Sequence, residues 1–205
     1  MIKHLHAGTA GAIAETAAYL RQGQLVIFPT DTVYGIGADA FNEEAVALLY
    51  EAKQRPMAKA IPILLADMSG IWRVARTVPA IAERYSQQFW PGPLTLIVPK
   101  HPALPANISD SDSIAVRIPA CEVARSVIRA AGGAVATSSA NRSGQPAAQT
   151  AAEAINQLGD WVAAVLDNGP SPHGIASTIL DCTGTTPKVV RQGPILPEQL
   201  ALDTL

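Results

Sequence analysis

Cysteine, charge and long apolar runs are scarce in this chain, and each shortage excludes a class of protein. Only two cysteines, Cys121 and Cys182, occur among 205 residues and they lie far apart, so we expect a reduced, cytoplasmic protein. Charged residues make up 16% of the chain and the formal net charge is -2, which argues against the basic surface of a non-specific nucleic-acid binder. No apolar run approaches roughly 18 residues, and no secretory signal pattern opens the chain, so we expect no membrane span.

Several catalytic motifs are also missing. No G-x-x-x-x-G-K-[ST] segment occurs, so a nucleotide site here would not be a P-loop. Without a G-x-S-x-G segment, covalent catalysis is not indicated, and without a His/Cys cluster we assign no metal ligand. Residues 35–40 match the loose dinucleotide pattern, but Glu43 and Glu44 open the next helix and would repel a pyrophosphate.

The chain is 48% hydrophobic, and its patterning predicts alternating helices and strands. The predicted helices cover residues 9–21 (with Thr9 as N-cap), 42–53, 79–89, 121–131 and 151–158. The predicted strands cover residues 25–28, 61–65, 94–98, 113–118, 134–136, 161–166, 177–180 and 189–190. This order predicts an α/β fold with a mixed sheet, in one domain over residues 1–193 followed by a short tail over 194–205.

Two short polar segments stand where hydrophobic runs stop. The lysine–arginine segment, residues 53–59, offers Lys53, Arg55 and Lys59. The serine–asparagine segment, residues 138–144, offers hydroxyls, an amide and a glycine. Cations beside a turn of small residues suit a polyanion such as a triphosphate, because charged donors and backbone N–H groups both reach its oxygens. The alternative for the first segment is a solvated helix end, where cations complement the helix dipole.

Two further features point to a ligand. Thr30, Asp31 and Thr32 follow the first buried strand, where open α/β sheets bind ligands, although a plain polar turn would look the same. Arg117 lies inside an apolar strand and needs an anionic partner. That partner is either a buried carboxylate of the protein or a carboxylate of the substrate, which arginine binds bidentately.

The order and spacing of these segments closely resemble the YrdC family over nearly the whole chain. The matching segments are PTDTVYGIG (29–37), KQRPMAK (53–59), WPGPLTLIV (90–98), SIAVRIP (113–119), SSANRSGQPA (138–147), DNGPSPHGIASTILD (167–181) and VVRQG (189–193). The resemblance implies a twisted, largely mixed β-sheet with flanking helices around a deep, positively lined cavity. It also implies a short bacterial-type synthase that makes threonylcarbamoyl-adenylate and pyrophosphate from L-threonine, bicarbonate or CO2, and ATP, for N6-threonylcarbamoyladenosine modification of tRNA.

Carried over by motif, the resemblance assigns residues to each substrate. L-threonine is assigned Thr32, Arg117, Ser139 and Ser177. ATP is assigned Arg55, Lys59, Ser113, Asn141, Ser143, Thr150 and Arg191, with Gln149 as an alternative to Thr150. Lys53 and Arg55 are the candidate catalytic residues, and Asp31 is a candidate base by location alone.

In the implied reaction the protein supplies no nucleophile but holds two anions together. Mg²⁺ would accompany ATP and be held mainly by its phosphates and water. Transient contact with tRNA and the threonylcarbamoyl transferase machinery is expected. Two alternatives stay open: an RNA-binding YrdC-like module, which the net charge disfavours, and a YciO-type paralogue without this activity, which the intact polar segments disfavour.

Overall fold

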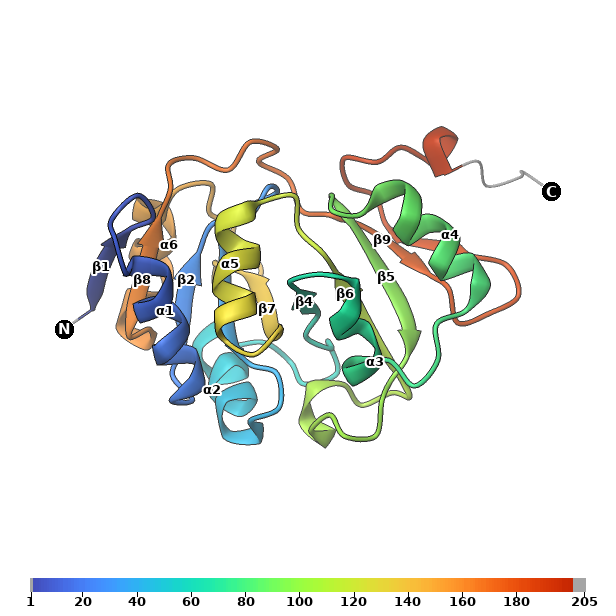
Figure 1. The fold of residues 1–205 in the computed structure, drawn as a ribbon, viewed down its shortest axis with the longest axis horizontal. Helices are drawn as coiled ribbons and strands as arrows, with labels where there is room; N and C mark the ends of the chain where they lie inside the picture. Colours follow the sequence, from blue (N-terminus) through green and yellow to red (C-terminus); the bar gives the residue numbers. More distant parts are fainter. Residues whose placement is uncertain (1, 201–205) are drawn as a thin grey trace.

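The structure is a computed structural model and describes residues 2–200. Ten strands form one sheet: β1 (Lys3–His6), β2 (Val26–Phe28), β3 (Gly35–Asp39), β4 (Ile63–Leu65), β5 (Leu94–Pro99), β6 (Ser113–Arg117), β7 (Ala134–Ser139), β8 (Ala164–Asp167), β9 (Thr178–Asp181) and β10 (Lys188–Arg191). Their order across the sheet is β1-β8-β2-β3-β7-β4-β6-β5-β9-β10 (Figure 1). Parallel pairs such as β4–β6 and antiparallel pairs such as β5–β6 both occur, so the predicted mixed sheet is confirmed.

Helices cover both faces of this sheet. They are α1 (Ala12–Arg21), α2 (Glu43–Lys53), α3 (Ile71–Val74), α4 (Ala80–Phe89), α5 (Glu122–Ala130) and α6 (Ala151–Leu158), with four 3₁₀ turns between and after them. The larger apolar cluster includes Leu49 of α2, Tyr85 of α4 and Leu158 of α6. The smaller one joins Leu20 of α1 to Val127 of α5, and these two helices pack on each other (Figure 1).

Helix α2 illustrates how local sequence fixes an element that later carries site residues. Asn42 caps its start, and its side-chain oxygen accepts a hydrogen bond from the Ala45 N–H at 3.0 Å. Gln54 ends the helix in the left-handed region at φ 50°. The lysine–arginine segment therefore begins on the last helical residue, Lys53, and continues into a loop, as the sequence predicted.

Four sequence predictions are corrected. Strands β1 and β3 were not predicted, and helix α1 begins after Gly11 instead of a Thr9 cap. The predicted strand over 161–166 begins only at Ala164. β3 was overlooked because its glycines suggest a turn. They are required by packing instead, since a Cβ on Gly37 would lie 2.7 Å from Cε1 of Phe28.

The end of the chain packs on the domain as far as the structure describes it. Ile195 and Leu200 are buried in the larger apolar cluster, and the Tyr85 hydroxyl donates to the Leu200 carbonyl at 2.8 Å. The rest of the predicted tail, residues 201–205, lies outside the described residues. Among residues 2–200, none of the helices has the length and apolar character that crossing a membrane requires.

Candidate active site

A pocket of about 490 Å³ opens on one face of the sheet, within the range typical of small-molecule sites. Strand alternation creates it. Ile114 and Val116 of β6 enter the larger apolar cluster, whereas Ser113, Ala115 and Arg117 of the same strand line the pocket. The neighbouring strand β5 repeats the pattern, with leucine and valine toward the core and Thr95 and Ile97 toward the pocket.

The position of Leu64 shows which face of the sheet carries the pocket. It belongs to the apolar cluster beneath α1 and α5 and also lines the pocket. It is also paired with Arg117 in the parallel β4–β6 register. The pocket therefore lies on the face that α1 and α5 cover elsewhere, over the strands that these helices leave uncovered.

Charge is distributed unevenly around the pocket. The cationic residues that line it are Arg55, Lys59, Arg117 and Arg191. Within the part of the chain that the structure describes, Asp110 is the one acidic residue that lines it. Such an excess of cations favours an anionic ligand.

The Arg117 guanidinium is buried at one end of the pocket. Its Nη2 lies 2.5 Å from Oδ1 of Asp31, its Nη1 donates to the Thr32 hydroxyl at 2.8 Å, and its Nε donates to the Gly92 carbonyl at 2.9 Å. Burial lowers the pKa of Arg117, and the Asp31 carboxylate acts in the opposite direction. Arg117 and Thr32 line the pocket, whereas Asp31 is 3% exposed and is not among the lining residues. The protein carboxylate that the sequence left open is therefore present.

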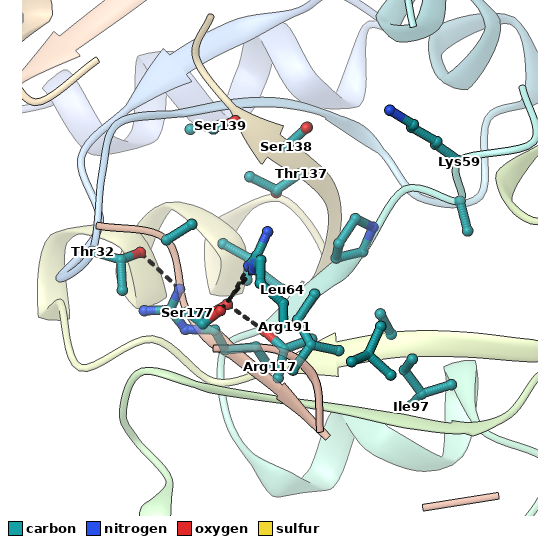
Figure 2. A pocket seen from close by; sticks show the side chains of 18 of the residues that line it. Thr32, Lys59, Leu64, Ile97, Arg117, Thr137, Ser138, Ser139, Ser177 and Arg191 are labelled. Carbon is teal, nitrogen blue, oxygen red and sulfur yellow. Dashed lines mark hydrogen bonds between the residues drawn. The ribbon is translucent and has the colours of Figure 1, made fainter. Parts of the chain in front are cut away.

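Arg191 and Ser177 lie next to this end. The Arg191 Nε donates to the Ser177 carbonyl at 2.9 Å and its Nη2 donates to the Ser177 hydroxyl at 3.1 Å. Burial lowers the pKa of Arg191, and the charges of Arg117 and Arg55 lower it further. Figure 2 shows Thr32, Arg117, Ser177 and Arg191 gathered together, with Lys59 farther away.

Arg55 and Lys59 also line the pocket, and Arg55 shapes the loop that holds them both. The Arg55 Nε donates to the Lys59 carbonyl at 2.8 Å, and its Nη2 donates to the Ala60 carbonyl at 2.9 Å. Burial lowers the pKa of Arg55. Ser113 shares this region, and its hydroxyl lies 3.0 Å from that of Ser111.

Lys53 is placed differently from its neighbours. It is 1% exposed and is not among the lining residues. Its Nζ donates to the carbonyls of Ser139 and Asn141 at 2.5 and 2.6 Å, and its own carbonyl accepts from the Ser143 N–H at 2.9 Å. Burial, with a smaller contribution from Arg55, lowers the pKa of Lys53 to about 7. Lys53 therefore joins the two polar segments from behind the pocket.

Three other residues assigned by the resemblance also lie off the pocket lining. The Asn141 amide nitrogen donates to the carbonyls of Arg142 and Gln145, and Ser143 is exposed. Thr150 caps α6, where its hydroxyl accepts from the Glu153 N–H at 3.3 Å. Ser139, in contrast, lines the pocket from the end of β7.

The apolar floor of the pocket was not predicted from the sequence. Leu64, Ile97, Ala115, Ile179 and Val190 all line it. The alternating pattern of residues 113–117, with small or polar side chains at odd positions and Ile or Val at even ones, was a usable signal. It could not show that the odd positions face a cavity instead of bulk solvent.

The fold and the pocket define an α/β protein with a pocket lined by arginines and hydroxyls, a lining that suits an anionic small molecule. A family model for Sua5, YciO and YrdC, whose description is Telomere recombination, matches residues 18–193. The chain belongs to this Sua5/YciO/YrdC family, as the motif resemblance implied.

Relatives of known name support this membership. A Mycobacterium tuberculosis protein, provisionally named threonylcarbamoyl-AMP synthase, is 42% identical over 190 residues, which is 92% of this chain and 87% of that protein. A Pyrococcus abyssi threonylcarbamoyl-AMP synthase is 37% identical over 185 residues, 90% of this chain. The chain spans only 54% of that longer relative.

Solved structures agree with the fold. Pyrococcus abyssi Sua5, crystallised in complex with L-threonine, matches with a TM-score of 0.93 at 35% identity, over 98% of this chain and 59% of that one. Escherichia coli YciO matches with a TM-score of 0.85 at 21% identity, over 98% of both chains. The second likeness shows the fold alone, so the architecture does not separate a synthase from a YciO-type protein.

Proposed function

We propose that this chain is a threonylcarbamoyl-AMP synthase, a nucleotidyltransferase that joins L-threonine, bicarbonate or CO2, and ATP. The observation that carries the proposal is one pocket that is lined by Arg117 and Thr32 and also by the cations Arg55, Lys59 and Arg191. Arginine suits a carboxylate, and a group of cations suits a polyphosphate. The names of the M. tuberculosis and P. abyssi relatives support the same activity.

In this proposal L-threonine binds at the Arg117 end, beside Thr32, Ser139 and Ser177. All four residues line the pocket. ATP binds toward Arg55, Lys59 and Ser113, with Arg191 held beside Ser177 where the two substrates would meet. Asn141, Ser143 and Thr150 would support the ATP site through the loops they fix and would not contact the nucleotide in this conformation.

The reaction needs positioning more than a protein nucleophile. The threonine ammonium loses a proton to solvent, the resulting amine forms a C–N bond to CO2, and a second proton passes from that nitrogen to solvent, giving a carbamate. A carbamate oxygen then attacks the α-phosphorus of ATP, the bond from that phosphorus to the bridging oxygen breaks, and pyrophosphate leaves. Arg55 and Arg191 would stabilise the charge that develops on the phosphate oxygens, in a site where burial strengthens electrostatic interactions. Lys53 would act by holding the serine–asparagine segment.

Mg²⁺ would enter with ATP and be bound mainly by phosphate oxygens and water, where it neutralises phosphate charge. Oxygen donors beside the cations fit this arrangement, since Asp110, Ser111 and Ser113 all line that part of the pocket. The product would be used in the cytoplasm to modify tRNA, through the threonylcarbamoyl transferase machinery. Residues 1–193 would form the catalytic domain.

The test is to incubate the purified protein with L-threonine, bicarbonate, ATP and Mg²⁺. We expect pyrophosphate and a threonylcarbamoyl-adenylate detected by mass spectrometry, with turnover that requires both threonine and bicarbonate. Release of ADP and orthophosphate, or ATP turnover that does not depend on threonine, would contradict the proposal. Binding of RNA without ATP turnover would favour the RNA-binding alternative, and a folded protein inactive with all substrates would favour the YciO-type alternative.

A further inference from the structure

The four cations of the pocket differ in one respect. Arg117 forms a buried salt bridge with Asp31. Among the residues that the structure describes, Arg55, Lys59 and Arg191 form no salt bridge with any carboxylate. The Arg117–Asp31 pair is therefore close to neutral, whereas Arg55, Lys59 and Arg191 carry uncompensated positive charge.

Asp31 is fixed in place from two sides. The Thr30 hydroxyl accepts from the N–H groups of Thr32 and Val33 at 3.2 and 3.3 Å and donates to the Val33 carbonyl at 2.7 Å, which closes the turn around Asp31. The His173 N–H donates to the Asp31 carbonyl at 3.1 Å. The position of the carboxylate is thus built into the fold.

The Asp31 carboxylate is incompletely satisfied. Oδ1 meets Arg117, whereas Oδ2 is buried and has no hydrogen-bond partner among residues 2–200. The ion pair with Arg117 is therefore the interaction through which the Asp31 carboxylate acts on the pocket.

Arg117 still has donors to offer a ligand. A guanidinium carries five N–H groups, one on Nε and two on each Nη. Three of them donate to Gly92, Thr32 and Asp31. One N–H on Nη1 and one on Nη2 therefore remain free for a ligand. Two donors are enough for one carboxylate. The neighbouring negative charge repels a second anion in proportion to the charge of that anion. A zwitterionic amino acid with no net charge is repelled least, and a phosphate dianion or a triphosphate is repelled far more.

We propose that Asp31 directs the two anionic substrates to different cations, because it neutralises Arg117 so that this guanidinium accepts a monocarboxylate and disfavours phosphate groups. The polyphosphate is then directed to Arg55, Lys59 and Arg191. Asp31 is a positioning and specificity residue here, not the base that contacts substrate. The identity of the two anions rests on the proposed function, but the rejection of phosphate does not.

The test measures inorganic phosphate binding by isothermal titration calorimetry at constant ionic strength, without threonine or ATP. Asp31→Asn keeps an oxygen for the Arg117 Nη2 but removes the charge. We expect it to gain a phosphate site, or to bind phosphate at least about tenfold more tightly. The double variant Asp31→Asn/Arg117→Gln should lose this gain. A purely structural role for Asp31 would not create new anion binding.

The matched control is Asp160→Asn, which removes one exposed carboxylate charge outside the pocket lining and does not touch Arg117. No gain in Asp31→Asn, an equal gain in Asp160→Asn, or a gain that survives in the double variant would overturn the proposal. If Asp31→Asn does not fold, the proposal is tested instead by following the NMR signals of the arginine Nε–Hε groups in the wild-type protein as phosphate is added. Phosphate should then shift the signals of Arg55 and Arg191, and a larger shift at Arg117 would overturn the proposal. Failure of the wild type to bind threonine would count against the proposed function only.

Discussion

The Lys53 ammonium donates a hydrogen bond of 2.5 Å to the carbonyl of Ser139, so the last residue of α2 is joined directly to the end of β7. A second bond of 2.6 Å reaches the Asn141 carbonyl. This one side chain holds together the two polar segments, through bonds between residues 86 and 88 positions apart in the chain. Since Ser138 and Ser139 line the pocket, the position of these serines depends on Lys53.

Lys53 should make the stability of the protein depend on pH. Burial lowers its pKa in the folded state from 10.5 to about 7. Between these two pKa values the unfolded chain binds a proton at Lys53 that the folded protein does not bind. The free energy of unfolding therefore rises with pH across this window, and it falls as the pH drops toward 7. The neutral amine still has two N–H groups for its two carbonyl acceptors.

We expect the unfolding free energy of the wild type minus that of Lys53→Met to increase from pH 7 to pH 10, with a slope of up to about 1.4 kcal/mol per pH unit. Urea denaturation of both proteins at each pH measures it. Comparing the two proteins cancels the titration of groups that they share. Parallel curves across this range would show that Lys53 stays protonated in the folded protein.

Arg55→Ala should weaken the use of ATP severely. The side chain lines the pocket and holds two carbonyls of its own loop, and one charge-assisted hydrogen bond contributes about 1.5–3 kcal/mol. That range corresponds to a loss of roughly 10- to 150-fold in kcat/KM for ATP. Arg55→Lys should also be impaired, because lysine lacks the planar fork.

Arg142→Ala is the matched control for Arg55→Ala, since Arg142 lies in the serine–asparagine segment, does not line the pocket and donates to the Gln157 carbonyl. It should keep wild-type kinetics for ATP. Initial rates of pyrophosphate release at varied ATP concentration measure all three variants. Normal turnover of ATP by Arg55→Ala would show that the lysine–arginine segment does not contact the phosphates.

The amino-acid site should discriminate against valine more sharply than against serine. Serine lacks one methyl group, which costs roughly 1–3 kcal/mol in an apolar pocket. Valine keeps the shape but lacks the hydroxyl, so polar groups near the substrate, with Thr32 and Ser177 as candidates, would remain buried without a partner. Competition of the two amino acids with threonine in the pyrophosphate assay measures this preference. Equal use of valine and serine would mean that the pocket does not recognise the hydroxyl.

Gly193→Ala should disturb the Ser177 end of the pocket. A Cβ at Gly193 would lie 2.4 Å from the Ala176 carbonyl oxygen and 2.5 Å from the Ser177 carbonyl carbon, both of them backbone atoms. The backbone around Ser177 must therefore shift. We expect a stability loss of about 1–3 kcal/mol and a higher KM for threonine.

Gly184→Ala provides the comparison, because its Cβ would meet nothing closer than the Thr186 carbonyl oxygen at 3.7 Å, an ordinary contact. Thermal unfolding and threonine kinetics of both variants test the prediction. If both behave alike, the close approach at Gly193 does not control the site.

Local sequence determined every helix except the short α3, most of the strands and the two polar segments. The Asn42 cap starts α2, and the break at residues 90–93 separates α4 from β5. Both signals depend only on residues that are close in the chain, so the local sequence pattern was enough to find these three elements. The same local rules failed at β3, where glycine is required by Phe28 and Thr137, which approach from other strands.

The tertiary structure alone decided what the charged residues do. The sequence identified Arg117 as a cation in need of an anion, but only folding brings Asp31, distant in sequence, to within 2.5 Å of it. The sequence likewise grouped Lys53 with Arg55, yet the helix end buries Lys53 against carbonyls of β7 and the following loop, and the chain beyond it turns Arg55 into the pocket. The reason is physical: a motif fixes which groups lie close along the chain, whereas burial, ion pairing and pKa depend on groups that only the sheet brings together.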